Sequence, residues 1–227
     1  MSEQTAGLRE RKRQRTYRAI SDAAVALFLE KGFAAVSVTE IAEAAEVSKP
    51  TLFRYFPAKE DMALHRFADH EDEAARVVLA RGGVTTPLDA LEVHFLAGLE
   101  ARDPVTGLCD AKEVLAFHRL LYGTPSLVAR LHSYTARSEG ALAAALADSA
   151  DERPPLSARL AAAQIVAAQR VLAMENWRRV AAGASADTLH PRAADDARHA
   201  FALLRTGLAP HTDGAPAPGT GTGATPA

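Results

Sequence analysis

VSVTEIAEAAEVSKPTLFRYFPAK, residues 36–59, is the stretch that decides the fold. It predicts two short helices joined by a tight turn and followed by the start of a third. Thr39 is a suitable N-cap for the first helix, and Ile41 with its alanine neighbours gives that helix one apolar side. Ser48 is a suitable cap for the second helix, with Pro50 in its first turn, where a missing N–H costs nothing.

The second of these helices has two different sides. Leu52 and Phe56 can point back to a core, and Pro57 stops the helix. The outward side carries Lys49, Thr51, Arg54 and Tyr55. A short helix with hydroxyls and cations on its exposed side suits an anionic polymer, and a helix-turn-helix places such a helix in the DNA major groove.

The segment before this stretch is strongly basic. Glu10 is the lone acidic residue among the cations Arg9, Arg11, Lys12, Arg13, Arg15 and Arg18. The whole chain has a net charge of −2, so the basic bias is local. A local basic arm is what phosphate binding needs. We therefore expect a flexible arm over residues 1–10 and phosphate contacts from Arg13 and Arg15; the alternative is a solvated tail without a partner.

Composition limits the possible classes of protein. The chain has 227 residues, of which 48% are apolar and 6% aromatic, and alanine is abundant, which favours helices. Cys109 is the single cysteine, so an intrachain disulfide is excluded and a reducing cytosol fits. No apolar run approaches the roughly 20 residues of a membrane span. We expect a cytoplasmic protein without a membrane partner.

Helical periodicity continues through most of the chain, and no strand pattern is convincing. Besides the two short helices, helices are predicted over about 11–31, 58–80, 86–102, 108–122, 125–147, 157–182 and 189–208. The expected fold is all-α, with about nine helices in a helix-turn-helix domain over 11–60 and a larger domain over 61–208. The tail over 209–227 is rich in Gly, Pro and Thr, which predicts disorder.

The segment AISDAAVALFLEKGFAAVSVTEIAEAAEVSKPTLFRYFPAKED resembles the TetR family of bacterial transcriptional repressors. The resemblance covers about residues 15–61 and includes a Phe after the Gly, a Thr opening the second helix and a YF-x-x-KE ending. Glu46 stands in the turn where the family often has Gly, so a non-glycine residue is expected in a strained conformation. Pro50 and Phe53 stand where Gly and Tyr are common, and Phe53 cannot donate a hydroxyl hydrogen bond.

The resemblance implies an all-helical homodimer whose three-helix heads bind a palindromic double-stranded DNA operator. It implies phosphate contacts from Thr39, Ser48, Tyr55 and Lys59. Base edges are expected to meet Lys49, Pro50, Thr51 and Phe53, and Arg54 completes the expected DNA-binding set. The alternative is that Thr39 and Ser48 are only caps and Phe53 only core.

The larger domain is similar to the family's ligand-binding and dimerisation domain. The segments RLLYGTPSLVARL and RLAAAQIVAAQRVLAMENWRR resemble an actinobacterial subgroup with an acyl-CoA-like ligand-binding C-terminal domain. Candidate ligand-binding residues, which interrupt apolar stretches, are His94, His118, Tyr122, His132, Gln164, Gln169 and Asn176. The alternative for His118 and His132 is a surface histidine or a core histidine with satisfied hydrogen bonds.

The last two helices are expected to pair with their copies as a four-helix bundle; the alternative is an intramolecular core. Candidate interface residues are Leu160, Leu172, Trp177, Phe201 and Leu204. The histidines lack metal-ligand spacing with Cys or carboxylates, and no catalytic arrangement stands out, so neither a metal, a cofactor nor an enzyme is expected. The expected function is a repressor released by a small hydrophobic or amphipathic effector. Alternatives are an activator or effector-free global regulator, and a lipid carrier or enzyme on the same scaffold.

Overall fold

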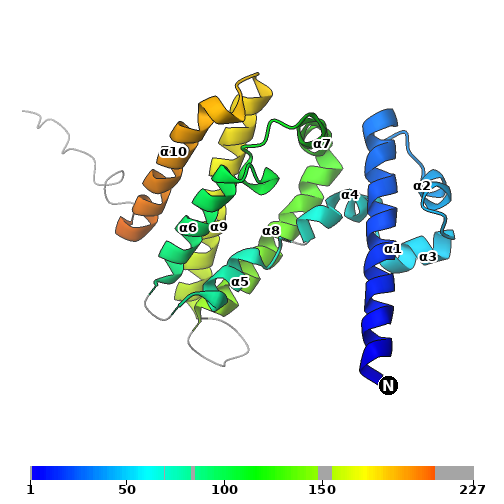
Figure 1. The fold of residues 1–227 in the computed structure, drawn as a ribbon, viewed down its shortest axis with the longest axis horizontal. Coiled ribbons are helices and arrows are strands. Elements are labelled where there is room, and N and C mark those ends of the chain that lie inside the picture. Colours follow the sequence, from blue (N-terminus) through cyan, green and yellow to red (C-terminus); the bar gives the residue numbers. More distant parts are fainter. Residues whose placement is uncertain (1, 69, 83–84, 148–154, 208–227) are drawn as a thin grey trace, which may run out of the picture.

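The protein is helical throughout the residues that the structure describes. The computed structural model describes residues 2–68, 70–82, 85–147 and 155–207, and these form ten α-helices and one 3-10 helix (Figure 1). The predicted all-α class is confirmed. None of the helices in this part of the chain combines the length and the hydropathy needed to cross a bilayer.

Four helices form the N-terminal head. They are α1 (Ser2–Lys31), α2 (Val38–Ala44), α3 (Lys49–Tyr55) and α4 (Lys59–Ala68). Figure 1 shows α1 as a long rod flanked by α2 and α3 on one side, with α4 leading away to the rest of the chain. α1 begins at Ser2, so residues 2–10, expected as a flexible arm, are helical instead. Glu, Gln and Arg are good helix formers, and a helix already nucleated by packing extends at little cost.

The start of α2 corrects one expected cap. Ser37, not Thr39, is the N-cap: the Glu40 N–H donates to Ser37 Oγ (3.2 Å), and the Ser37 N–H donates to Glu40 Oε2 (2.8 Å). This reciprocal capping box satisfies two backbone donors at once, and a Thr at position 39 cannot do so. These hydrogen bonds, with help from Lys31, lower the pKa of Glu40 to about 2.

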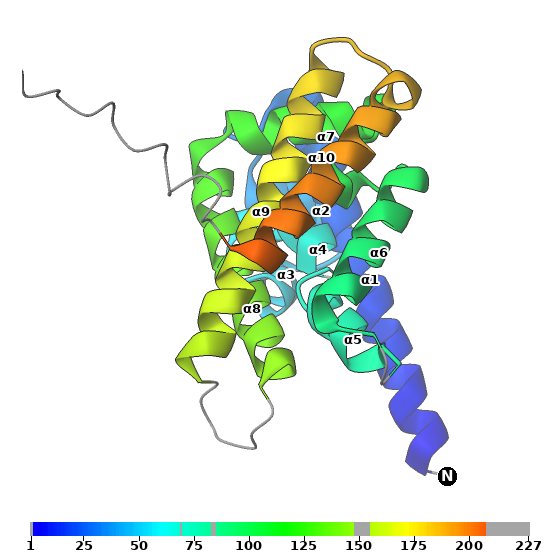
Figure 2. The same cartoon turned by 90° about the vertical axis from the view of Figure 1, so that its left-hand side faces the viewer.

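Six helices form the C-terminal body. They are α5 (Glu73–Ala80), α6 (Pro87–Glu100), α7 (Lys112–Gly123), α8 (Pro125–Leu146), α9 (Leu156–Ala181) and α10 (Ala186–Thr206), with the 3-10 helix η1 (Pro104–Thr106) between α6 and α7. α9 packs between α8 and α10, and α10 also packs on α6. Figure 2 shows α9 and α10 side by side on one face of the body. The expected helix over 58–80 is divided into α4 and α5, which raises the helix number to ten.

Two hydrophobic cores stabilise this arrangement. The first lies in the head around Ile20, Phe28 and Leu52, and it extends to Phe117 of α7 and Tyr134 of α8. The second lies within the body between α5, α6, α8, α9 and α10. The head core thus includes side chains of the body, and α7 and α8 pack directly on the head.

Candidate nucleic-acid interface and effector cavity

Helix α3 is held by one side and exposed on the other. Leu52 and Phe56 are buried in the head core, as predicted. The opposite side exposes Lys49, Pro50, Phe53 and Arg54. Phe53 is 48% exposed, so it is not a core residue of this chain. The outer side of α3 therefore combines two cations with an apolar surface.

The turn before α3 is as the sequence predicted. The Thr51 N–H donates to Ser48 Oγ (3.2 Å), which makes Ser48 the N-cap, and the hydroxyls of these two residues lie 2.8 Å apart. Glu46 has φ +53°, in the left-handed region that favours glycine, so the expectation of a strained residue is confirmed. A side chain in this conformation costs about 1 kcal/mol. This backbone conformation contributes to the direction in which the chain leaves α2 for α3.

Tyr17 places the basic part of α1 beside α3. Its ring centroid lies 4.8 Å from that of Tyr55 and 5.1 Å from that of Phe56. The guanidinium of Arg13 stacks over Tyr17, and that of Arg54 stacks over Tyr55, each 5.6 Å from the ring centroid. Sequence reasoning missed Tyr17; its signal was its position one helical turn after Arg13.

Two of the expected phosphate-binding residues differ from expectation: the ammonium of Lys59 turns inward, and Thr39 is not a helix cap. Lys59 Nζ donates to the Phe33 carbonyl and lies 4.4 Å from the Phe33 ring centroid. Burial lowers the pKa of Lys59. Its ammonium thus closes the end of the head core rather than facing solvent. Thr39 is exposed on α2, away from the cap role expected for it.

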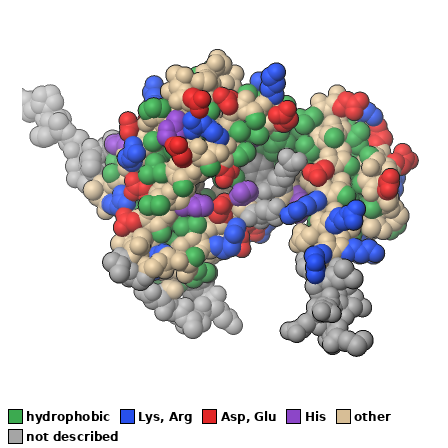
Figure 3. Space-filling view, viewed as in Figure 1, with side chains coloured by type: hydrophobic (Ala, Val, Ile, Leu, Met, Phe, Trp, Pro, Cys, Tyr) green, Lys and Arg blue, Asp and Glu red, His purple; other side chains and the backbone are tan. Residues whose placement is uncertain are grey.

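The charges of the head are segregated. Figure 3 shows Lys and Arg side chains gathered at the lower end of the head, over α1 and α3, and Asp and Glu side chains toward its upper outer side. The exposed cations of α1 described here include Arg11, Lys12, Arg13 and Arg15. A surface with one sign of charge beside an exposed helix is the electrostatic pattern of a phosphate-binding face.

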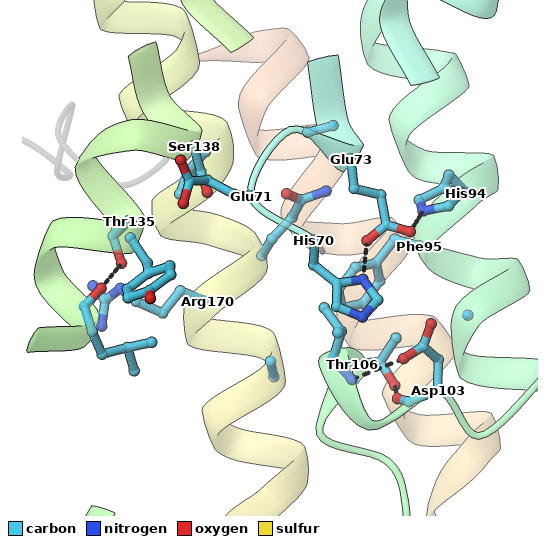
Figure 4. Close-up of a pocket in the computed structure, with 18 of the residues that line it drawn as sticks. His70, Glu71, Glu73, His94, Phe95, Asp103, Thr106, Thr135, Ser138 and Arg170 are labelled. Carbon is cyan, nitrogen blue, oxygen red and sulfur yellow. Dashed lines mark hydrogen bonds and ion pairs between the residues drawn. The ribbon is translucent and has the colours of Figure 1, made fainter. Parts of the chain in front are cut away.

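The body contains a cavity of about 230 Å³ between α5, α6, α7, α8, α9 and η1, here called the body cavity. Figure 4 shows Arg170 and Thr135 on one side of it and Glu73 and His94 on the other. Of the candidate ligand-binding residues, His94, Tyr122 and Gln169 line this cavity. Sequence reasoning missed other polar lining residues, because the loop and helix turns that carry them have no distinct pattern: His70, Glu73, Thr135, Ser138 and Arg170.

Glu73 organises one wall of the body cavity. Its Oε2 lies 2.7 Å from His70 Nδ1 and its Oε1 lies 3.2 Å from His94 Nε2. These contacts, that with His70 first, lower the pKa of Glu73. The described residues contain no cluster of His, Cys, Asp and Glu suited to a metal ion.

A second cavity of about 410 Å³, here called the junction cavity, lies between α1, η1 and α7. His118 lines it, is buried, and has no hydrogen-bond partner for Nδ1 among the described residues. Burial lowers the pKa of His118 to about 4. This histidine is therefore neither of the two alternatives that the sequence suggested.

The other candidate ligand-binding residues do not line a cavity described here. His132 and Gln164 are exposed. Asn176 is buried, and its Nδ2 donates to the Thr106 carbonyl (3.0 Å), which ties α9 to η1. The side-chain amide of Asn176 therefore makes a structural contact between α9 and η1 and does not face a cavity described here.

The candidate interface residues divide in the same way. Leu160 is 52% exposed on α9. Leu172 and Phe201 are buried in the body core, so their expected place at a dimer surface is wrong. Trp177 packs on Tyr122, with ring centroids 4.8 Å apart, and Leu204 packs against the body core. Helical periodicity does not tell whether an apolar side covers its own core or a partner.

Comparison with known proteins agrees with the head geometry. Residues 20–65 match a family described as bacterial regulatory proteins, tetR family. The head of the chain matches the TetR family. It is a family of transcriptional regulators rather than of enzymes. The family match lies in the head, from α1 to α4.

Relatives of the chain extend the likeness into the body. It is 34% identical over 142 residues to the HTH-type transcriptional regulator TcmR of Streptomyces glaucescens, which is 62% of this chain and 63% of that one. The aligned part is thus less than two thirds of the relative's length. A solved TetR-family regulator of Streptomyces coelicolor is 20% identical, with a TM-score of 0.51, over 85% of this chain and 96% of the other.

NalD of Pseudomonas aeruginosa, described as the secondary repressor of a multidrug efflux pump, is similar to the same extent. It is 20% identical over 86% of this chain and 97% of the other, with a TM-score of 0.50. At these identities, the two solved structures establish the shared helical fold, with a helix-turn-helix head and a helical body.

Proposed function

We propose that the protein is a ligand-responsive transcriptional repressor that binds a palindromic DNA operator as a homodimer in the cytoplasm. The observation that carries this proposal is the outer side of α3, where Lys49, Phe53 and Arg54 are exposed beside the basic cations of α1. Lysine can bind guanine O6 and N7, and a phenyl edge can contact a thymine methyl. The cations of α1 and the Ser48 cap supply contacts to phosphates, which fix the register.

The proposed dimer uses the outer sides of α9 and α10. Leu156, Leu160 and Val171 are apolar side chains of α9 that are 65%, 52% and 58% exposed. Exposed apolar side chains that recur along one helix favour association. A two-fold dimer places two α3 helices in successive major grooves when they are about 34–36 Å apart, so it reads a palindrome.

The proposed effector binds in the body cavity and acts on the head through α4. Asp61 of α4 makes two hydrogen bonds to Arg130 of α8, and the Ser21 hydroxyl of α1 donates to the Met62 carbonyl (2.8 Å). Residues of α8 also line the body cavity. An effector that favours one position of α8 would therefore shift α4 and the spacing of the heads. It must bind that form more tightly than the DNA-bound form.

The test is fluorescence anisotropy with a labelled duplex from the intergenic region next to the gene. The wild-type protein should bind this duplex in preference to a scrambled duplex of the same composition. Lys49→Ala should weaken binding about tenfold, the loss of one good base contact, and Arg119→Ala, an exposed cation of α7, should leave it unchanged. Equal binding to both duplexes would contradict the proposal. A reporter under this promoter should rise in a deletion strain, and a fall would indicate an activator.

A further inference from the structure

The body cavity contains a guanidinium that is not neutralised by the residues around it. Arg170 of α9 lines the cavity, and within the described residues it makes no ion pair with a carboxylate. By contrast, Arg137 of the facing helix α8 forms an ion pair with Glu71 (2.7 Å). Arg170 is thus available to bind an anion.

We propose that the effector is an amphipathic anion, a molecule with an apolar body and one negatively charged group that Arg170 binds. This inference rests on the proposed function, which makes the body cavity the effector site. Guanidinium is suited to this task because its planar fork matches a carboxylate or sulfonate with two parallel hydrogen bonds.

The carboxylates of the cavity do not oppose such a ligand at Arg170. Glu71 is bound to Arg137, and Glu73 lies between His70 and His94. Asp103 Oδ1 accepts the N–H of Val105 (3.0 Å) as the cap of η1. Figure 4 shows Glu73, His94 and Asp103 across the cavity from Arg170. The carboxylates of Glu73 and Asp103 therefore lie on the far wall with local partners, and the carboxylate of Glu71, on the nearer side, is engaged by Arg137.

The charge of Arg170 reaches into the cavity. Burial raises the pKa of the Tyr122 hydroxyl, and the nearby positive charge of Arg170 acts on that pKa in the opposite direction. Tyr122 itself lines the cavity and is fixed against Trp177. An anion in the cavity beside Tyr122 would be close to the guanidinium.

The rest of the lining suits an apolar body. Phe95, Leu131, Val166 and the ring of Tyr134 line the cavity together with Tyr122. Ligand sites usually combine such apolar walls with a few polar groups that fix orientation. Aromatic rings on several walls favour a flat ring system, which can meet them edge-on or stacked.

The inference is tested with two dyes that share one aromatic body. 8-Anilinonaphthalene-1-sulfonate carries a sulfonate, and N-phenyl-1-naphthylamine lacks it. Fluorescence titration should show that Arg170→Gln weakens binding of the sulfonate dye about five- to tenfold and leaves the neutral dye unchanged, as expected for one charge-assisted contact at a partly exposed site. Arg170→Lys should retain part of the affinity, and the sulfonate dye should bind less tightly as salt increases.

Arg178→Gln is the matched control, since Arg178 is an exposed cation of the same helix that does not line the cavity. It should leave both dyes unchanged. Equal loss of both dyes in Arg170→Gln, or no loss of the sulfonate dye, would overturn the anion site. Near-ultraviolet circular dichroism checks that the variant keeps its tertiary packing, because loosened proteins bind the sulfonate dye nonspecifically.

Operator anisotropy with the sulfonate dye separates this inference from the proposed function. If the dye binds through Arg170 and lowers operator affinity, both are supported. If the dye binds through Arg170 and no ligand of the cavity alters operator affinity, the anion site stands and the ligand-responsive mechanism fails.

Discussion

The ion pair between α4 and α8 should contribute measurably to stability. Arg130 Nε lies 2.7 Å from Asp61 Oδ1 and Nη2 lies 3.0 Å from Oδ2, a bidentate geometry. The Asp61 side chain is 8% exposed and that of Arg130 is 40% exposed. A hydrogen bond to a charged group contributes about 1.5–3 kcal/mol when buried, and an exposed ion pair less than about 1 kcal/mol. We expect a coupling free energy near 1.5 kcal/mol, because water still reaches the guanidinium.

A double-mutant cycle measures this coupling. The free energy of unfolding is obtained by urea denaturation for the wild type, Asp61→Asn, Arg130→Gln and the double variant, all at one protein concentration because a dimer's stability depends on it. Arg130→Gln should be the more destabilising single change. Within the described residues, it leaves the buried carboxylate with the Ala58 N–H at 3.2 Å as its hydrogen-bond donor.

The control cycle uses Asp195 and Arg198 of α10, a pair whose side chains are 77% and 58% exposed. Water and salt screen this pair, so its coupling should be below about 0.5 kcal/mol. Equal coupling in the two cycles, or none between Asp61 and Arg130, would refute the reasoning that burial makes the α4–α8 pair effective.

Three further predictions follow from single positions. Gly107→Ala should lower the free energy of unfolding by more than about 3 kcal/mol in thermal unfolding, because a Cβ there would lie 1.9 Å from the Ala173 carbonyl oxygen. The control is Gly183→Ala, also at positive φ but in open space, which should cost only about 1 kcal/mol. Burial lowers the pKa of His118 in the folded protein to about 4, from its ordinary value of 6.5. Because the unfolded state binds more protons between these pH values, the free energy of unfolding should fall by up to about 3 kcal/mol as pH drops from 6.5 to 4. Denaturation at several pH values should show that His118→Leu removes this slope, and an unchanged slope would assign it to another group. Arg54→Gln should weaken operator binding and reduce the slope of log K against log salt by about 0.9; an unchanged slope in salt-dependent anisotropy would mean that Arg54 does not contact phosphate.

The sequence predicted the helix-turn-helix of the head because the signals for it are local. A cap such as Ser48, a proline in the first turn and an apolar spacing that buries Leu52 each act within one or two helical turns. Such signals depend on local backbone hydrogen bonds and side-chain direction, so they can be read from the sequence without the tertiary structure. The strained turn at Glu46 was predicted instead from the resemblance to a family that often has Gly at this position.

Two predictions in the head were wrong, one because of a neighbouring residue and one because of a residue distant in sequence. Thr39 and Ser37 are both good caps, and the choice depended on Glu40, which completes the box only with Ser37. Lys59 was expected outside, and it turned inward because the Phe33 carbonyl and ring lie within its reach. Neither partner is near Lys59 in sequence.

The composition, the periodicity and the 36–59 stretch by themselves determined an all-helical protein with a helix-turn-helix head. Only the tertiary structure decided which apolar side chains of α9 and α10 face the body core, where Phe201 is fully buried and Leu160 is not. It alone brought Arg170 of α9 to the same cavity as Glu73 of α5 and His94 of α6. Helices rich in alanine look alike on every side, so the contents of a cavity depend on how each helix is rotated against its neighbours. That rotation is set by packing between distant segments and not by the order of residues within one helix.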